Sequence, residues 1–167
     1  MTEAKIHKAA IQALESCYNS SNFESLDAWL SEDAVYESQW VLKPLKGKRA
    51  IMHYFKMKME TIRKTKTLVT AKEAVLRLPR KLNKIAEGTM MLYYKDREPC
   101  LIISQHNEDN VVAVLLIKMS GSGLIERMDL CMPQLFSWDI VGEDKKEMAP
   151  SSFGIDARPS INRKWQN

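Results

Sequence analysis

Lys58 is the side chain whose surroundings most suggest chemistry, because it falls on the apolar face of a predicted helix. At about 100° per residue it lies between Ile51 and Tyr54 on the helical wheel. An ammonium group there must extend to the edge of the apolar surface, pair with a carboxylate or face a wet cavity. The first alternative is the simplest. The others predict contact with an anionic ligand, or a base whose pKa is lowered by burial.

Two carboxylates are the remaining candidates for acid–base chemistry. Asp129 lies two residues after Arg127 on a predicted strand, so both side chains point to the same side of the sheet. Glu87 shares a face of an earlier predicted strand with Tyr93. On a face that lines a cavity, either carboxylate could move a proton, whereas on a solvated face it only keeps the surface polar. Asp129, Glu87 and Lys58 are therefore the catalytic candidates, and the sequence does not choose among them.

Metal and cofactor chemistry have no support in the residue spacing. The histidines His7, His53 and His106 lack the spacing of a metal site. No Walker motif, glycine-rich dinucleotide motif or serine nucleophile elbow occurs. Basic residues cluster between positions 46 and 66, but the aromatic residues there fall on the buried side, where they could not stack on bases. We expect no metal, no cofactor and no nucleic acid.

Helices come first in the chain and strands follow. The spacing of apolar residues predicts helices over residues 3–19, about 23–30 and about 48–64, with a strand over 34–40. From residue 67 the period falls from 3.6 to 2. Short turns then separate candidate strands at about 68–78, 84–95, 99–106, 110–119 and 123–131. Strands joined in this way should pair antiparallel and in order, so the fold class is α+β with helices covering one face of a sheet.

The composition is that of one soluble globular domain. The chain has 167 residues, enough to bury a full core, and its longest apolar run, 111–117, is too short to cross a bilayer. The polar N-terminus lacks the apolar core of a signal peptide, which favours a cytoplasmic location. The widely spaced Cys17, Cys100 and Cys131 are predicted to be buried thiols.

The end of the chain differs from the rest. Residues 142–167 are rich in Gly, Pro, Ser and charge and show no periodicity. We therefore expect the domain to span residues 1–135, followed by a tail over 136–167 that is partly disordered or docked on the domain.

Three stretches carry a resemblance to a known family. They are Leu30-Ser-Glu-Asp-Ala-Val-Tyr-Glu-Ser38, Pro44-Leu-Lys-Gly-Lys-Arg-Ala-Ile-Met-His-Tyr-Phe55 and Gly123-Leu-Ile-Glu-Arg-Met-Asp129. Together they resemble the nuclear transport factor 2-like superfamily, in its SnoaL-like branch, over roughly residues 5–132. The resemblance implies a cystatin-like cone, in which three N-terminal helices pack on a strongly curved, mostly antiparallel sheet and a pocket opens between them. Members usually form dimers. A shared fold does not fix a reaction.

The resemblance also bears on catalysis. Its steroid-isomerase members have the same spacing between their Asp-Ala step and the helix-opening Gly as this chain has from Asp33 to Gly47. Their proton-abstracting carboxylate then falls on Ser38, and their phenol falls on or near Leu14. Neither Leu nor an unassisted Ser can shuttle a proton near neutral pH, so isomerase activity of that kind is disfavoured.

Alternation along the first strand places Tyr36, Ser38 and Trp40 on one face. Two aromatic walls and a hydroxyl suit a planar or apolar ligand held by one or two hydrogen bonds, although both aromatics could equally be plain core. The predicted ligand-binding residues are therefore Tyr36, Ser38, Trp40, Tyr54 and Lys58.

Three functions remain open. The first is a small-molecule-binding domain that holds an apolar or aromatic ligand in the pocket. The second is a SnoaL-like enzyme (cyclase, dehydratase or hydrolase) that uses a pocket carboxylate, Asp129 or Glu87. The third is an interaction module, because the run 111–117 is apolar on both faces and both must be covered. A homodimer through the sheet face would cover one of them, and no membrane contact is expected.

Overall fold

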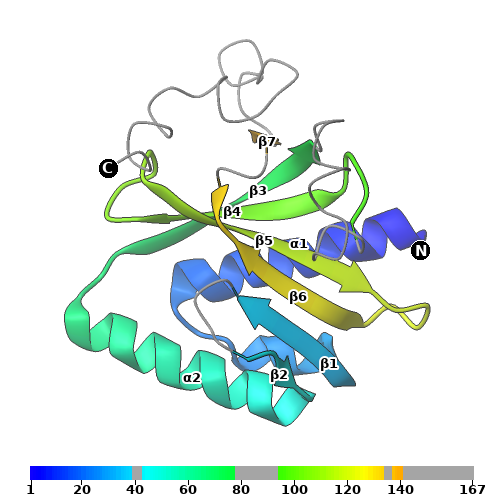
Figure 1. Cartoon of the computed structure of the whole chain (residues 1–167), viewed down its shortest axis with the longest axis horizontal. Coiled ribbons are helices and arrows are strands. Elements are labelled where there is room, and N and C mark those ends of the chain that lie inside the picture. The colour runs from blue at the N-terminus through cyan, green and yellow to red at the C-terminus, as the bar shows by residue number, and fades with distance from the viewer. Residues whose placement is uncertain (39–42, 78–93, 134–136, 141–167) are drawn as a thin grey trace.

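A computed structural model describes residues 1–38, 43–77, 94–133 and 137–140 of the chain. Two α-helices, α1 (Glu3–Ser20) and α2 (Lys48–Thr65), pack on one face of a seven-stranded sheet (Figure 1). A 3-10 helix of five residues, η1 (Glu24–Ala28), stands where the sequence predicts the second of three helices. The α+β class is confirmed, but the expectation of three N-terminal helices is not, since the segment between α1 and α2 forms only this short 3-10 turn.

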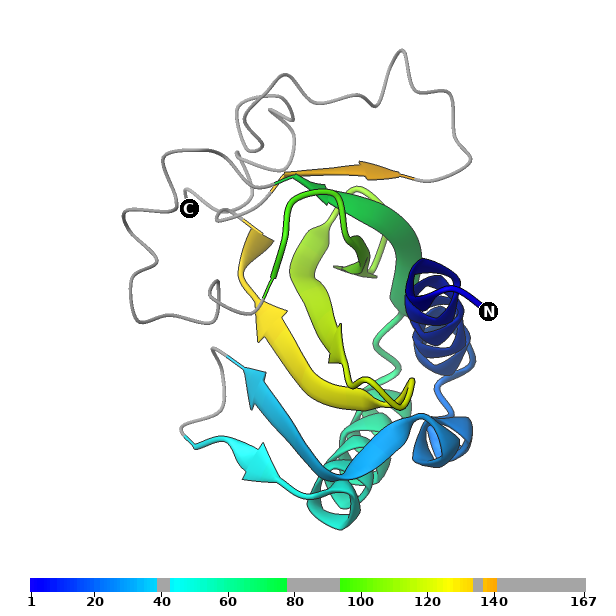
Figure 2. The ribbon, with the colours of Figure 1, turned by 90° about the vertical axis from the view of Figure 1, so that its right-hand side faces the viewer.

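The sheet is curved and mixed. Its strands in chain order are β1 (Leu30–Ser38), β2 (Leu45–Lys46), β3 (Val69–Arg77), β4 (Pro99–Gln105), β5 (Val111–Met119), β6 (Ile125–Cys131) and β7 (Ser137–Ile140). Across the sheet they run β2-β1-β6-β5-β4-β3-β7. Strands β4, β5 and β6 pair antiparallel in chain order, as predicted. Strand β3 pairs directly with β4, although the sequence predicts a strand at 84–95 between them, and β1 lies parallel to β6. Figure 2 shows the sheet curling around the side on which both helices lie.

The ends of this sheet bear on two predictions. Most of the strand expected at 84–95 lies outside the described residues. Strand β7 pairs antiparallel with β3, so residues 137–140 of the predicted tail belong to the sheet. Residues 141–167 lie outside the described part, and the division into a domain over 1–135 and a tail stays a prediction.

The helices form where the sequence pattern places them, and local contacts fix their ends. The Thr2 side chain caps α1 by accepting a hydrogen bond from the Lys5 amide. Helix α2 begins after Gly47, whose φ of 94° lies in the region that favours glycine and whose amide donates to the Ala34 carbonyl at 2.8 Å. The buried stripe of α2 is Ile51, Phe55 and Met59, four residues apart, which therefore all face the sheet.

Both faces of the sheet are buried within the single chain. On β5, Leu115 packs in the cluster beneath the helices, while Val114 and Leu116 pack in a second cluster on the outer face. Cys100 and Cys131 belong to the outer cluster and Cys17 to the inner one, so the prediction of buried thiols is confirmed. The described residues of β5 are thus buried on both faces, and the homodimer stays a prediction.

Within the described residues, neither helix combines the length and the apolarity that crossing a membrane requires.

Candidate functional site

A cavity of about 440 Å³ lies between the helices and the concave face of the sheet. On the sheet side it is lined by three cross-strand pairs: Ser38 with Leu130, Ala113 with Ile103, and Val69 with Gln105. Paired residues on neighbouring strands point to the same face, so curvature of the sheet brings all three pairs around one space. The sheet contributes mainly apolar walls.

Helix α2 closes the cavity with one stripe of side chains. Tyr54, Lys58 and Ile62 stand four residues apart, which places them one above the other on the same side of the helix. The periodicity that placed Lys58 on the apolar face therefore turns it toward the cavity, and three of the five predicted ligand-binding residues, Ser38, Tyr54 and Lys58, line it.

Tyr18 enters the same cavity from α1. The side chain is 1% exposed, and its hydroxyl has no hydrogen-bond partner. Burial, followed by the nearby Tyr54 and Cys17, raises the pKa of Tyr18. The phenol therefore keeps its proton and can donate a hydrogen bond, which nothing in the described structure accepts. A buried donor in this state costs free energy unless a ligand or a water satisfies it.

Tyr36 stands behind the cavity rather than among its lining residues. It is completely buried, with its ring centroid 5.3 Å from that of Tyr54. Burial, then the phenols of Tyr18 and Tyr54, raises the pKa of Tyr36. The hydroxyls of Tyr54 and Ser38 are close enough to influence this pKa, but neither forms a hydrogen bond of good geometry with the Tyr36 oxygen. Tyr36 therefore supports the Tyr54 ring from behind.

The structure describes one of the three remaining predicted site residues, Asp129. Trp40 and Glu87 lie outside the described residues. Asp129 is on β6, but it points to the opposite face of the sheet from Leu130, into the outer cluster. It is completely buried there.

Asp129 is the centre of a buried polar network. The Arg127 guanidinium donates to both of its carboxylate oxygens, at 2.8 and 3.0 Å, and the Tyr94 hydroxyl donates to it as well. Arg127 also pairs with Glu37 on β1 at 3.1 Å. Desolvation raises the pKa of Asp129, although the hydrogen bonds from Tyr94 and Arg127 act against this. The network joins β1 and β6, which is a structural role for Asp129.

Comparison with known proteins places this geometry in a fold. No family model matches the chain, and no curated protein matches it in sequence. Among solved structures it is similar to a proposed ketosteroid isomerase from Kribbella flavida DSM 17836, with a TM-score of 0.51, 13% identity and coverage of 90% of this chain and 93% of that one. It is also similar to the epoxide hydrolase/cyclase-like enzyme SalBIII of salinomycin pyran ring formation, with a TM-score of 0.50, 14% identity and coverage of 77% and 91%.

The chain has the nuclear transport factor 2-like fold. The resemblance seen in the sequence is thereby confirmed at the level of the fold. At 13 and 14% identity the two structures show the fold alone, so the chemistry of this cone has to be argued from its own residues.

Tyr18 is the pocket residue that the sequence analysis missed. The family's phenol was placed on or near Leu14, one helical turn earlier, where this chain has no hydroxyl. Tyr18 follows Leu14 by four residues and continues the buried stripe through Ala10 and Leu14. Extending that stripe by one turn would have found it. At Ser38, where the isomerases would carry their carboxylate, the cavity has a hydroxyl.

Removal of the Tyr18 hydroxyl is expected to leave the free protein equally stable or to stabilise it by about 1 kcal/mol, because the Tyr18→Phe variant no longer buries an unsatisfied donor. Urea unfolding measures the difference. The matched control is Tyr94→Phe, which removes a hydroxyl that does bond a buried carboxylate and should lose about 1.5–3 kcal/mol. A loss from Tyr18→Phe as large as that from Tyr94→Phe would mean that the Tyr18 hydroxyl has a partner.

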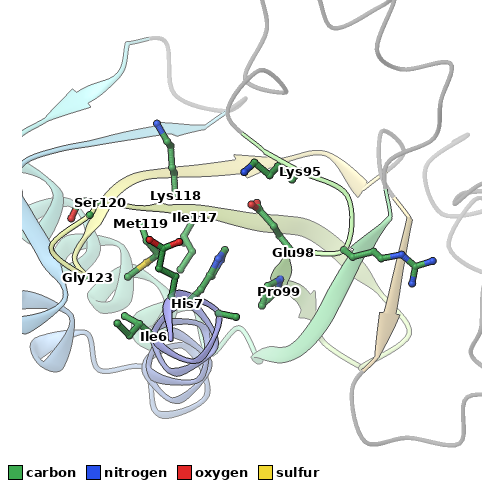
Figure 3. Close-up of a pocket in the computed structure, with 14 residues that line it drawn as sticks. Ile6, His7, Lys95, Glu98, Pro99, Ile117, Lys118, Met119, Ser120 and Gly123 are labelled. Carbon is green, nitrogen blue, oxygen red and sulfur yellow. The ribbon is translucent and has the colours of Figure 1, made fainter. Parts of the chain in front are cut away.

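A second cavity, of about 410 Å³, lies at the start of α1 and is lined by His7, Lys95, Glu98, Lys118 and Ser120, among others (Figure 3). Lys95 is exposed to solvent, and Lys118 pairs with Glu126 at 2.8 Å. In Figure 3 the Lys118 side chain points away from His7. The two lysines are thus solvated or already partnered, which makes this cavity a poorer candidate for an anionic ligand than the cone pocket.

His7 in this second cavity should make the protein sensitive to acid. Burial lowers the pKa of His7 from 6.5, with a backbone hydrogen bond to Pro99 acting against it, and its Nε2 atom is buried without a partner. As the pH falls through 6.5, the unfolded chain takes up a proton that the folded chain does not, so stability is lost. The free energy of unfolding of the wild type, relative to His7→Gln, should fall between about pH 7 and pH 5. A difference that is constant over this range would contradict the prediction.

Proposed function

We propose that the chain is a small-molecule-binding domain that holds an apolar or aromatic ligand in the cone pocket. The observation that carries this proposal is the buried Tyr18 hydroxyl, which lines the pocket and lacks a hydrogen-bond partner. Buried polar groups are satisfied in nearly all folded proteins, and a group that is not satisfied by the protein is available to a ligand.

The size and lining of the pocket support the same proposal. Its volume of about 440 Å³ falls in the range of small-molecule sites. Ile103, Val112 and Leu130 give it apolar walls, while Tyr18, Tyr54 and Lys58 supply a few polar groups. Apolar walls with a few placed hydrogen-bonding groups are the usual composition of such sites.

The enzyme alternative finds less support in this cavity. The described residues that line it include no carboxylate, and Asp129 lies on the opposite face of the sheet. The pocket carboxylate that this alternative requires is therefore absent from the described lining, and Lys58 is the one catalytic candidate from the sequence that the described lining contains. The reactions of the structural relatives belong to those proteins.

A ligand screen that compares the wild type with a variant whose pocket is filled by a larger side chain tests the proposal. Val112 lines the cavity and is only partly buried, so a Val112→Trp substitution should fill the space without overpacking the centre of the core. We expect hydrophobic compounds at about 100 times their Kd to stabilise the wild type by about 2.7 kcal/mol, or roughly 5–10 °C in thermal unfolding. Val112→Trp should abolish this shift.

The matched control is Leu68→Trp, which adds the same ring at an exposed position outside the cavity. It should leave the thermal shift unchanged. The proposal fails if no compound in a diverse hydrophobic library stabilises the wild type, or if Val112→Trp responds to the compounds as the wild type does.

A further inference from the structure

The polar groups around the cone pocket are unbalanced in charge. Lys58 is the one formally charged side chain among the described residues that line it. Its Nζ atom lies 5.7 Å from the centroid of the Tyr54 ring, and no ion pair with Lys58 occurs among the described residues. Among the described residues, the pocket therefore holds a positive charge that faces an aromatic ring and has no carboxylate partner.

This arrangement disfavours the charged form of the lysine in the free protein. Burial lowers the pKa of Lys58, and no described group opposes the shift. The ring of Tyr54 attracts the ammonium, but it does not neutralise it. A negative charge brought into the pocket by a ligand would offset the desolvation of Lys58. The attraction between this charge and the ammonium would be stronger in the low-dielectric pocket than in water.

Beside the hydroxyls of Ser38 and Tyr54 and the amide of Gln105, which can both donate and accept, two lining groups are donors that lack an acceptor among the described residues. Lys58 donates up to three hydrogen bonds and accepts none, and the buried Tyr18 hydroxyl carries a proton that no described group accepts. Both groups therefore call for an acceptor on the ligand. A carboxylate supplies acceptor oxygens and the compensating charge together.

We infer that the cone pocket binds apolar monocarboxylic acids in their ionised form, with the carboxylate at Lys58 and the apolar body against the walls formed by Ile103, Val112 and Leu130. This inference rests on the proposed function, because it names the ligand class of the same pocket. It makes Lys58 the residue that selects the ligand's charge.

A phosphorylated ligand fits the site less well. Phosphate groups are usually held by several backbone amides, a helix N-terminus or an arginine fork. Lys58 lies ten residues after Lys48, the first residue of α2, which puts it about 15 Å along the helix from those free amides. The single ammonium of Lys58 among apolar walls matches the single negative charge of a carboxylate better than the higher charge of a phosphate.

Calorimetric measurement of the affinities of three isosteric probes for the full chain tests the inference. The probes are 2-naphthoate, its primary amide 2-naphthamide, and 2-naphthylmethylammonium, which share one apolar body and differ in charge. We expect the wild type to bind the carboxylate about tenfold tighter than the amide, and the amide tighter than the ammonium. Comparison of these three affinities needs no variant.

A variant pair then locates the charge. Lys58→Met should weaken binding of 2-naphthoate about tenfold and leave binding of 2-naphthamide within about twofold. Lys56→Met, which removes an exposed lysine from the same helix, should change neither affinity. If Lys58→Met does not fold, Lys58→Gln replaces it and should show the same selective loss.

The inference is overturned if the amide binds as tightly as the carboxylate, or if Lys58→Met weakens both probes equally. It is also overturned if none of the three probes binds at about 1 mM while neutral hydrophobic compounds do. In each of these cases the proposed binding function survives. Both fall if no compound in the thermal-shift screen stabilises the wild type, or if Val112→Trp responds to the compounds as the wild type does.

Discussion

An Asp129→Ala variant should lose about 3–5 kcal/mol of unfolding free energy, the range expected when one partner is removed from a buried ion pair. Asp129 is completely buried, and it accepts two hydrogen bonds from Arg127 and one from Tyr94. The alanine leaves the Tyr94 hydroxyl unsatisfied, and the Arg127 guanidinium, whose side chain is 12% exposed, keeps Glu37 as its carboxylate partner. Urea or guanidinium unfolding measures the loss.

Glu126, which lies three residues before Asp129 on β6, provides the control for this experiment. It pairs with Lys118 at 2.8 Å, but both side chains are substantially exposed. Glu126→Ala should therefore cost at most about 1 kcal/mol, although it also removes a carboxylate of β6 from an ion pair. An Asp129→Ala loss no larger than that of Glu126→Ala would show that the buried network contributes nothing beyond a surface pair.

A Phe55→Ala variant should lose about 3–5 kcal/mol, since truncation of a buried phenylalanine removes its transfer free energy and leaves a cavity. Phe55 is completely buried on α2 and lies at the centre of an aromatic cluster. Its ring stacks on Phe23 with centroids 4.5 Å apart and meets Tyr36 edge-on at 5.2 Å. The same cluster supports Tyr18 and Tyr54, so loss of the Phe55 ring should also weaken ligand binding in the cone pocket.

Met57→Ala is the control on the same helix. Met57 is 50% exposed, and its truncation should change the free energy of unfolding by no more than about 0.5 kcal/mol. Equal losses from the two variants, measured by the same denaturant unfolding, would mean that the aromatic cluster is not the packing centre of the helical face.

The sequence predicts both α-helices, most of the described strands and the direction of several side chains, but it misses β2 and β7 and predicts an α-helix where η1 is a 3-10 turn. In α2 the 3.6-residue period places Ile51 and Phe55 in the core and turns Lys58 toward the same side, and the structure agrees. The prediction succeeds because the apolar stripe of a helix is the face that packs against the rest of the protein. The strand periods after residue 67 are equally informative, since the period of 2 follows from the backbone itself.

Alternation fails where a strand is irregular. Strict alternation on β6 groups Ile125 with Arg127 and Cys131, yet Ile125 packs in the inner cluster and Cys131 in the outer one. The register between β5 and β6 shifts between Lys118 and Met119, and this shift moves Ile125 to the other face. Nothing in the spacing of apolar residues marks such an irregularity in advance.

The tertiary structure alone decides which groups meet. Alternation correctly puts Arg127 and Asp129 on one side of β6, but only the packed sheet shows that this side is covered and that Tyr94 and Glu37 complete the network. Likewise, the approach of α1 to α2 brings Tyr18 beside the stripe of Tyr54 and Lys58. From the sequence come the two α-helices, the strands at the positions of β3 to β6 and an anomalous lysine on an apolar face. The partners of those side chains depend on contacts between segments far apart in the chain, and local periodicity does not predict such contacts.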